Sequence, residues 1–384
     1  FIRPDTDVFF FLSFLREIFE RQAVDRARTG RFMTGLDELE AFVSGWTPER
    51  TAEVTKIPAE TLREMVSAYL QADGATCVSG TGIGMGTNGT LAVWLLECIN
   101  AVTGNLDRRG GMLVGRGIFD FAAFGVKNGL FVSEERSRIG GFKAVNDAFP
   151  GGILADEILT PGEDQIRGLF VTGGNPLMMM ANSGRLAEAL SDLELLVVTD
   201  IYLNETASLA HYVLPATSPL QRPDLPFIFP LFLGMQSIPY LAATERLVPP
   251  ENEQRDEATI YAELARASGV GIFDSKVLQR VLDGLLWLDA KRNPGRPPSL
   301  PQERILSLIL RLTRSGSFKE LVGHPNGKPR KSSRGGDYLG ERVVTEDGLV
   351  HLAPERFVAS AVKLEEDFEE ELASGTDHFR LISR

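Results

Sequence analysis

Apolar residues in the first hundred positions recur at helical spacing. Residues 8–19 are apolar around almost their whole circumference, which predicts a buried helix. In residues 58–70, Leu62, Met65, Val66 and Tyr69 form one apolar stripe, which predicts an amphipathic helix. Further helices are predicted at residues 36–43, 48–54 and 91–102. This part of the chain is therefore expected to be largely helical.

Residues 168–215 show a different pattern, in which short apolar runs alternate with a helical segment. Residues 169–171 and 195–198 have the length and composition of buried strands, and a helical stripe with Leu186 and Leu190 lies between them. A strand, helix and strand in this order form a right-handed crossover in a mostly parallel sheet. Ligands bind such sheets beyond the carboxyl ends of the strands. These ends carry the polar and small residues Gly173, Gly174, Asn175, Thr199 and Asp200.

A glycine-rich segment, residues 80–89, lies between a predicted strand at 75–79 and the helix at 91–102. Such a turn lets backbone amides approach a phosphate at a helix N-terminus. Gly84, Gly86 and Gly89 match the GxGxxG spacing, but Asp107, the acid at the usual distance, follows a Gly-Asn turn instead of a strand. A tight strand-to-helix turn without a ligand is the alternative interpretation.

The fold class expected from these patterns is α/β. We expect two doubly wound Rossmann-like lobes with mostly parallel sheets, followed by a helical extension with a small β element. The expected segments are 1–105, 106–265 and 266–384, and residues 117–164 are expected to be mostly loop and short helix. The last segment contains predicted helices at 256–267, 276–287, 301–312 and 363–372, a hairpin of strands at 341–345 and 349–352, and a possible first strand of a further domain at 378–382.

Composition restricts the class of protein. The 384 residues are 43% hydrophobic with a formal net charge of -12, which is typical of a globular protein and argues against a nucleic-acid surface. No apolar run approaches a membrane span. Cys77 and Cys98 lie in apolar surroundings, which predicts two buried thiols and excludes a CxxC metal pair. The four histidines also lack metal-ligand spacing.

Four motifs in this order resemble the molybdopterin oxidoreductase family of the dimethyl sulfoxide reductase and formate dehydrogenase type. They are RPDTD at residues 3–7, GTGIGM at 80–85, VTGN at 102–105 with RGG at 109–111, and GGNP at 173–176 followed by VTD at 198–200 and ETASLAHYVLP at 205–215. The last group is the most specific, and the resemblance covers about residues 1–265. It implies the central part of a catalytic subunit that carries bis(molybdopterin guanine dinucleotide) with molybdenum or tungsten.

The resemblance also implies roles for individual residues. Thr6 and Asp7 would face the guanosine of one pterin dinucleotide, and Gly80, Thr81, Gly82 and Met85 would lie against the cofactor. Gly174, Asn175, Thr199 and Asp200 would hold the other nucleotide end. A carboxylate can accept from the ring N–H and the exocyclic amine of guanine together. For Thr6 and Asp7, helix capping is the alternative role.

Some residues depart from the family pattern. Met85 stands where the family often has glutamine and Asp5 where it often has glycine, while His211 and Gln221 replace the usual Asp and Glu. Met85 lacks the amide that would donate a hydrogen bond, and His211 is expected to be a structural histidine.

The resemblance implies partners outside this segment. A molybdenum ligand and any iron–sulfur cluster would come from sequence before Phe1, and a cap domain would follow Arg384. The expected partners are these N- and C-terminal parts of the same subunit, with electron-transfer subunits as further candidates and no nucleic acid. The isolated segment is expected to be inactive. No signal is visible, and we favour the cytoplasm over the periplasm.

The full protein would oxidise a substrate by two electrons or transfer an oxygen atom. The alternatives are a stand-alone nucleotide-binding module, such as a dehydrogenase-like protein, and an inactive relic of the family used for assembly. A thiamine-diphosphate-like or transhydrogenase-like domain is a further alternative.

Overall fold

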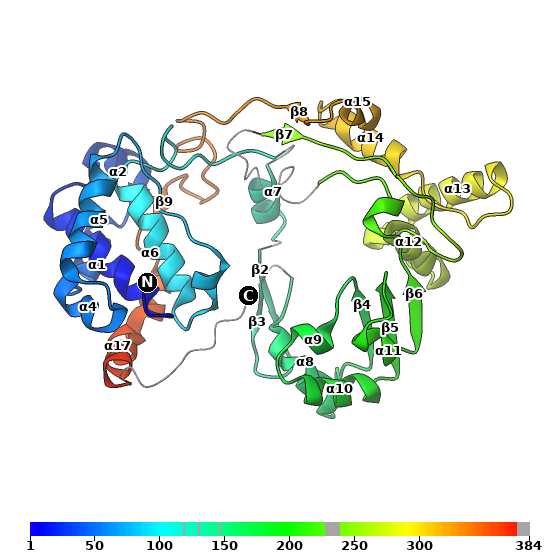
Figure 1. Cartoon of the computed structure of the whole chain (residues 1–384), viewed down its shortest axis with the longest axis horizontal. Helices are drawn as coiled ribbons and strands as arrows, with labels where there is room; N and C mark the ends of the chain where they lie inside the picture. Colours follow the sequence, from blue (N-terminus) through cyan, green and yellow to red (C-terminus); the bar gives the residue numbers. More distant parts are fainter. Residues whose placement is uncertain (118–119, 130, 146, 227–238, 375–384) are drawn as a thin grey trace. The chain divides into compact units, whose positions relative to one another are not determined.

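The computed structural model describes residues 1–117, 120–129, 131–145, 147–226 and 239–374 (Figure 1). The chain forms two compact units. The first unit combines Phe1–Gly115 with Lys331–Arg384, and the second unit is the continuous stretch Arg116–Arg330. The segment 266–384 expected from the sequence is thus shared between the two units, because the chain returns to the first unit after residue 330.

Helices build most of the first unit. They are α1 (Asp7–Glu20), α2 (Arg26–Phe32), α3 (Leu36–Val43), α4 (Pro48–Thr55), α5 (Ala59–Gln71) and α6 (Gly89–Val102). The helix α1 is buried on nearly all sides, as its apolar circumference predicts, and it packs against α6 and α4. On α5 the residues Leu62 and Val66 of the predicted stripe are buried. The helical predictions for this part of the chain are therefore confirmed.

The end of the described chain completes the core of the first unit. The two-residue strand β9 (Val350–His351) pairs in parallel with β1 (Met33–Thr34), and α16 (Glu355–Ser360) and α17 (Leu364–Ala373) follow it. The ring of Phe368 on α17 lies 5.3 Å from that of Phe9 and 5.5 Å from that of Trp46. The predicted hairpin at 341–352 is wrong, because residues 341–345 form no strand and β9 pairs with β1.

The strand predicted at residues 75–79 is also absent from the described structure. Side chains form the hydrogen bonds to this segment that the backbone of a neighbouring strand would otherwise form. The amide of Asn100 donates to the carbonyl of Cys77 at 2.9 Å, and its Oδ1 accepts from the Cys77 N–H at 2.8 Å. The Oδ1 of Asn105 accepts from the Ala75 N–H at 3.2 Å. These contacts satisfy the backbone of an extended segment that leads into a 3₁₀ turn, η1 (Thr81–Met85).

A three-stranded parallel sheet lies in the second unit, with the order β4 (Gly168–Thr172), β5 (Leu195–Asp200) and β6 (Tyr212–Pro215). In its register Thr172 lies opposite Thr199, and Asp200 lies opposite Pro215. The helix α10 (Ser183–Asp192) connects β4 to β5, and its Leu186 and Leu190 pack in one core with residues of both strands. The predicted crossover is confirmed.

The rest of the second unit is helical with short antiparallel strand pairs. It contains α7 (Phe121–Lys127), α8 (Leu154–Leu159), α9 (Pro176–Met179), α11 (Glu205–Ser208), α12 (Glu257–Ala267), α13 (Lys276–Arg292), α14 (Gln302–Leu312) and α15 (Phe318–Val322). The pair β2 (Val132–Arg136) and β3 (Lys143–Val145), and the pair β7 (Tyr240–Leu241) and β8 (Lys328–Pro329), are antiparallel. The pair β2–β3 was not expected in the loop-rich section 117–164.

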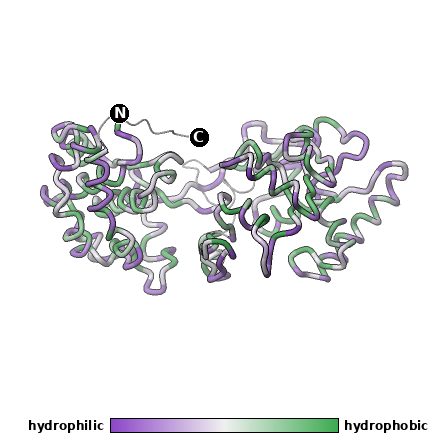
Figure 2. The backbone as a smooth tube through the Cα atoms, turned by 90° about the horizontal axis from the view of Figure 1, so that it is seen from below, coloured by the Kyte–Doolittle hydropathy of each residue, from purple (hydrophilic) through white to green (hydrophobic). Residues whose placement is uncertain are grey.

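The α/β class with mostly parallel sheets is confirmed. Hydrophobic and hydrophilic stretches alternate along the chain (Figure 2). None of the helices in the described part of the chain has both the length and the apolar character that crossing a membrane requires. The strand suggested at 378–382 lies outside the described residues.

Candidate functional site

The glycines of the 80–89 segment fall into two groups. A Cβ added to Gly80, Gly82 or Gly84 would meet no atom within 4 Å, and none of the three has a positive φ. By contrast, a Cβ on Gly89 would lie 2.7 Å from the Ile83 carbonyl oxygen, and one on Gly86 would collide with the Asp5 carboxylate. Internal packing therefore explains why positions 86 and 89 are glycine. It does not explain the glycines at 80, 82 and 84, where a ligand could approach the backbone closely.

The N-terminal motif is tied directly to this turn. Asp5 accepts from the Thr87 N–H at 2.8 Å and from the Thr87 hydroxyl at 3.1 Å. Its φ of 68° lies in the left-handed region, which suits glycine best and aspartate better than most residues. The structure thus brings the segment around Thr6 and Asp7 next to the glycine turn within the first unit.

Thr6 and Asp7 have different environments. Thr6 is 0% exposed, and its hydroxyl donates to the Arg3 carbonyl at 2.7 Å, so it stabilises the turn before α1. Asp7 is half-buried in the first turn of α1. Burial raises the pKa of the Asp7 carboxyl, the charge of Asp5 raises it further, and its own backbone N–H opposes both effects. An ionised Asp7 is therefore incompletely solvated and would gain from additional N–H donors.

In the 3₁₀ turn the Ile83 side chain packs against the core of the first unit, whereas those of Thr81 and Met85 do not. Thr81 is exposed, and Met85 is 68% exposed although it is apolar. Asp107, the acid at dinucleotide-motif distance, is 2% exposed. Its carboxylate accepts from the backbone N–H groups of Tyr338 and Leu339 at 3.1 and 3.0 Å. Asp107 therefore fixes the returning chain to the first unit, and the GxGxxG spacing has no acid for a ribose there.

A second polar cluster occupies the carboxyl edge of the parallel sheet in the second unit. Asp200 accepts from the Tyr202 N–H at 2.9 Å and from the Asn204 amide at 3.0 Å, and that amide also reaches the Gly174 carbonyl at 3.4 Å. The Gly173 N–H donates to the Thr199 carbonyl at 2.9 Å. The Thr199 side chain itself is buried. The structure thus brings together the strand ends that the sequence singled out.

Asn175 belongs to the same cluster through two neighbours. Its Oδ1 accepts from the Thr206 hydroxyl at 2.7 Å, and its amide donates to the Glu205 carboxylate at 2.6 Å. Glu205 is exposed. The N–H of its own backbone lowers the pKa of its carboxyl most, and the hydrogen bond from Asn175 lowers it further. Sequence reasoning missed Asn204 and Glu205 as members of this site. The available signal was their position just after the strand that ends in Asp200.

His211 and the two cysteines have structural contacts or partly to fully buried positions. The Nδ1 of His211 accepts from the Leu196 N–H at 2.9 Å, which is the structural role expected for it. Cys98 is buried, as expected, whereas Cys77 is only half-buried and lies in no strand. Burial raises the pKa of both thiols. Within the described residues no three His, Cys, Asp or Glu side chains are grouped so that they could hold a metal ion.

Comparison with known proteins identifies the family of this chain. The sequence model of the family described as molybdopterin oxidoreductase matches residues 18–267, which is more than half of the chain and includes both the glycine turn and the sheet edge. The chain belongs to the molybdopterin oxidoreductase family.

Two curated relatives have similar sequences. The chain is 24% identical over 293 residues to the probable oxidoreductase YyaE of Bacillus subtilis, covering 76% of this chain and 41% of that protein. It is 28% identical over 300 residues to the dimethyl sulfoxide/trimethylamine N-oxide reductase of Cereibacter sphaeroides, covering 70% of this chain and 35% of that one. The chain therefore spans less than half the length of these relatives.

A solved structure shows the same fold. Acetylene hydratase from Pelobacter acetylenicus matches with a TM-score of 0.69 and 20% identity, over 94% of this chain and 49% of that one. The fold of this chain is thus similar to that of about half of acetylene hydratase. The family resemblance inferred from the four motifs is confirmed, whereas the roles of the individual site residues stay predictions.

Proposed function

We propose that this chain is the central cofactor-binding part of a molybdenum- or tungsten-dependent oxidoreductase, and that each unit holds one nucleotide end of bis(molybdopterin guanine dinucleotide). The observation that carries the proposal is the open glycine surface at Gly80, Gly82 and Gly84 in a chain of this family. Neither backbone conformation nor internal packing requires glycine at these positions. A bulky ligand that lies against the backbone does require it.

The first unit would bind one nucleotide end through the glycine turn and Asp7. Gly80, Thr81, Gly82 and Met85 present an exposed surface, which fits a flat or phosphate-bearing group. The half-buried Asp7 carboxylate would accept N–H groups of guanine, which would stabilise its charged form. Thr6 would act through the turn that it stabilises, since its hydroxyl is already donated to Arg3.

The second unit would bind the other nucleotide end at the sheet edge. Asp200 uses each carboxylate oxygen once, for Tyr202 and Asn204, and each oxygen retains capacity to accept another donor. Gly174 has no positive φ, and a Cβ there would make only ordinary contacts at 3.8 Å or more, so its backbone is also open to a ligand. Asn175 and Thr199 would hold the edge in place through Thr206 and Gly173.

The bound metal would supply the two-electron redox chemistry, and this chain would supply binding and orientation. In the full protein the reaction would be substrate oxidation or oxygen-atom transfer. The metal ligand, any iron–sulfur cluster and the cap domain would come from other parts of the same subunit, with electron-transfer subunits as further partners. The isolated chain would not turn over, and we propose a cytoplasmic rather than a periplasmic location.

The decisive experiment measures cofactor content in the full-length protein that contains this chain. Gly82→Ala should fold normally, because the added methyl group meets no atom within 4 Å. It should lower molybdenum, pterin and releasable guanosine monophosphate together. Gly45→Ala is the matched control, since Gly45 also has open space around it and no positive φ but lies outside the motifs. Normal cofactor content in Gly82→Ala would contradict the role of the turn.

Asp200→Asn tests the second unit independently. The substitution keeps one oxygen for the Tyr202 N–H and removes the charge and the second acceptor, so guanine can no longer be bound by two acceptors. We expect reduced guanosine monophosphate and molybdenum, with the free energy of unfolding lowered by no more than about 1 kcal/mol for the lost hydrogen bond from Asn204. Absence of pterin and metal from the wild-type protein would instead support a stand-alone nucleotide-binding module or an inactive relic.

A further inference from the structure

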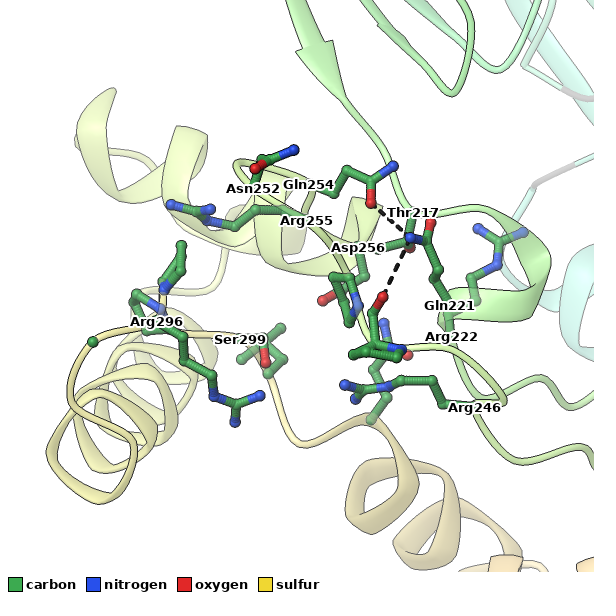
Figure 3. A pocket seen from close by; sticks show the side chains of 17 residues that line it. Thr217, Gln221, Arg222, Arg246, Asn252, Gln254, Arg255, Asp256, Arg296 and Ser299 are labelled. Carbon is green, nitrogen blue, oxygen red and sulfur yellow. Dashed lines mark hydrogen bonds between the residues drawn. The ribbon is translucent and has the colours of Figure 1, made fainter.

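A pocket of about 390 Å³ in the second unit has an arginine-rich wall. It lies between the segment that follows β6, the start of α12 and the loop between α13 and α14 (Figure 3). Arg222, Arg246, Arg255 and Arg296 all line it. This concentration of positive charge stands out in a chain whose formal net charge is -12. The volume is within the range of small-molecule sites.

The charges on this wall are only partly compensated. Arg222, Arg255 and Arg296 each pair with one carboxylate, at 2.6, 3.5 and 3.2 Å, but these carboxylates belong to residues that do not line the pocket: Glu257, Glu263 and Asp289. The acid that does line it is Asp256, whose two oxygens accept from Thr259. A guanidinium has five N–H donors, so one carboxylate leaves several of them for a ligand.

Arg246 carries the uncompensated charge. Among the described residues it has no ion-pair or hydrogen-bond partner. Figure 3 shows its guanidinium and that of Arg296 turned toward the same space, near the Ser299 hydroxyl. These three residues also line a smaller adjoining cavity of about 190 Å³, whose wall includes Arg304 and the carboxylates Asp289 and Glu303. Two arginines and a hydroxyl around one space form a donor set suited to an oxyanion.

Two uncharged residues of the pocket point to the same chemistry. Thr217 is 3% exposed, and its hydroxyl has no hydrogen-bond partner within the described residues, which is unusual for a buried polar group. Gln221 donates to the Gln254 side chain at 2.7 Å and to the Pro249 carbonyl at 3.4 Å. A glutamate at position 221 could not donate to them and would add a negative charge. The glutamine therefore keeps the pocket positive.

We propose that this pocket binds the phosphoryl group of a small molecule, with Arg246 and Arg296 as the principal donors. The site is separate from the residues assigned to the pterin dinucleotide: none of Gly174, Asn175, Thr199 or Asp200 lines it. The phosphoryl group belongs either to inorganic phosphate or to a nucleotide. Both sources present a dianionic oxygen cluster that two guanidinium groups bind through paired hydrogen bonds.

The test is calorimetric titration of the full-length protein with sodium phosphate and, separately, with adenosine 5′-monophosphate, at constant ionic strength set with sodium chloride. Arg246→Gln should weaken binding by about tenfold or more, because it removes a charge-assisted contact. Arg296→Gln should have a similar effect. The matched control is Arg280→Gln, because Arg280 is exposed on α13 of the same unit and does not line the pocket.

The outcomes distinguish the two sources of the phosphoryl group, and two of them would overturn the proposal. Equal affinity for both probes means that inorganic phosphate is sufficient for binding. Tighter binding of the monophosphate identifies a nucleotide as the ligand. Heat that matches the chloride blank for both probes would overturn the proposal, as would an equal loss in Arg280→Gln. Molybdenum and pterin content should stay at the wild-type level in Arg246→Gln, so this site and the cofactor assignment can fail independently.

Discussion

Asn100 holds the segment that leads into the glycine turn, and replacing it with alanine tests this connection. In the folded chain its side chain is 0% exposed and makes hydrogen bonds to both backbone groups of Cys77, at 2.8 and 2.9 Å. It also accepts from the Tyr69 hydroxyl at 3.1 Å. Asn100→Ala leaves these three groups without that partner.

The magnitude follows from the cost of unsatisfied polar groups. Each buried donor or acceptor that loses its partner costs about 1–3 kcal/mol. Cys77 and Tyr69 are only partly buried, so water can reach some of these groups after the substitution. We therefore expect Asn100→Ala to lower the free energy of unfolding by about 2–5 kcal/mol. We also expect local opening of residues 75–79.

Urea denaturation measures the first effect, and hydrogen exchange with mass spectrometry measures the second in peptides that cover residues 72–88. Thr90→Ala on the exposed side of α6 is the control, and it should change stability by no more than about 0.5 kcal/mol. The reasoning would be refuted if Asn100→Ala cost less than about 1 kcal/mol and left exchange in residues 75–79 unchanged.

Two further predictions concern titratable groups. Because burial raises the pKa of Asp7 above its ordinary value, its contribution to stability is lost as pH rises from about 3.9 through the raised pKa. Asp7→Asn should therefore raise the urea midpoint of cofactor-free protein, more at pH 7 than at pH 4; an advantage that does not vary with pH would contradict this. Burial raises the pKa of the Cys98 thiol strongly, so a thiol reagent at neutral pH should modify the half-buried Cys77 first and Cys98 only in denaturant. Rapid modification of Cys98 in folded Cys77→Ser protein would show that the thiol is accessible.

Periodic segments were predictable from the sequence because burial alone decides their structure. The stripe with Leu62 and Val66 and the apolar circumference of α1 each allow one solution, a helix with that face inward. The crossover from β4 to β5 was predictable for the same reason. Its two apolar runs are too short for buried helices, and the leucines between them match a helical face.

Elements that depend on distant partners were not predictable. Residues 75–79 are extended but lack a strand partner, since side chains from positions 100 and 105 satisfy the backbone. The strand β9 pairs with β1, far away in the sequence, so the local signal at Glu346-Asp347-Gly348 suggested a hairpin that does not form. The return of the chain to the first unit after residue 330 was not predictable, because a chain that leaves a core and comes back has no local signature.

The candidate site was predictable in its residue types and not in its contacts. Strand ends with Gly174, Asn175 and Asp200 are visible in the sequence, whereas the bridging role of Asn204 depends on the turn after β5. Likewise, the glycine motif gives no indication that Gly86 and Gly89 are required by packing while Gly82 is not. The arginine-lined pocket had no sequence signal, because its members come from well-separated segments.

The first unit is built from two separated stretches of chain, and this has a consequence for synthesis on the ribosome. The helix α1 is made before the second unit, whereas Phe368, whose ring lies against Phe9 and Trp46, is made only after the whole second unit has been translated. The continuous second unit can complete its core while the core of the first unit still lacks the residues that the returning chain supplies. During that interval the rings of Phe9 and Trp46 lack the contact with Phe368, and we expect this apolar spot of the first unit to be open to a chaperone.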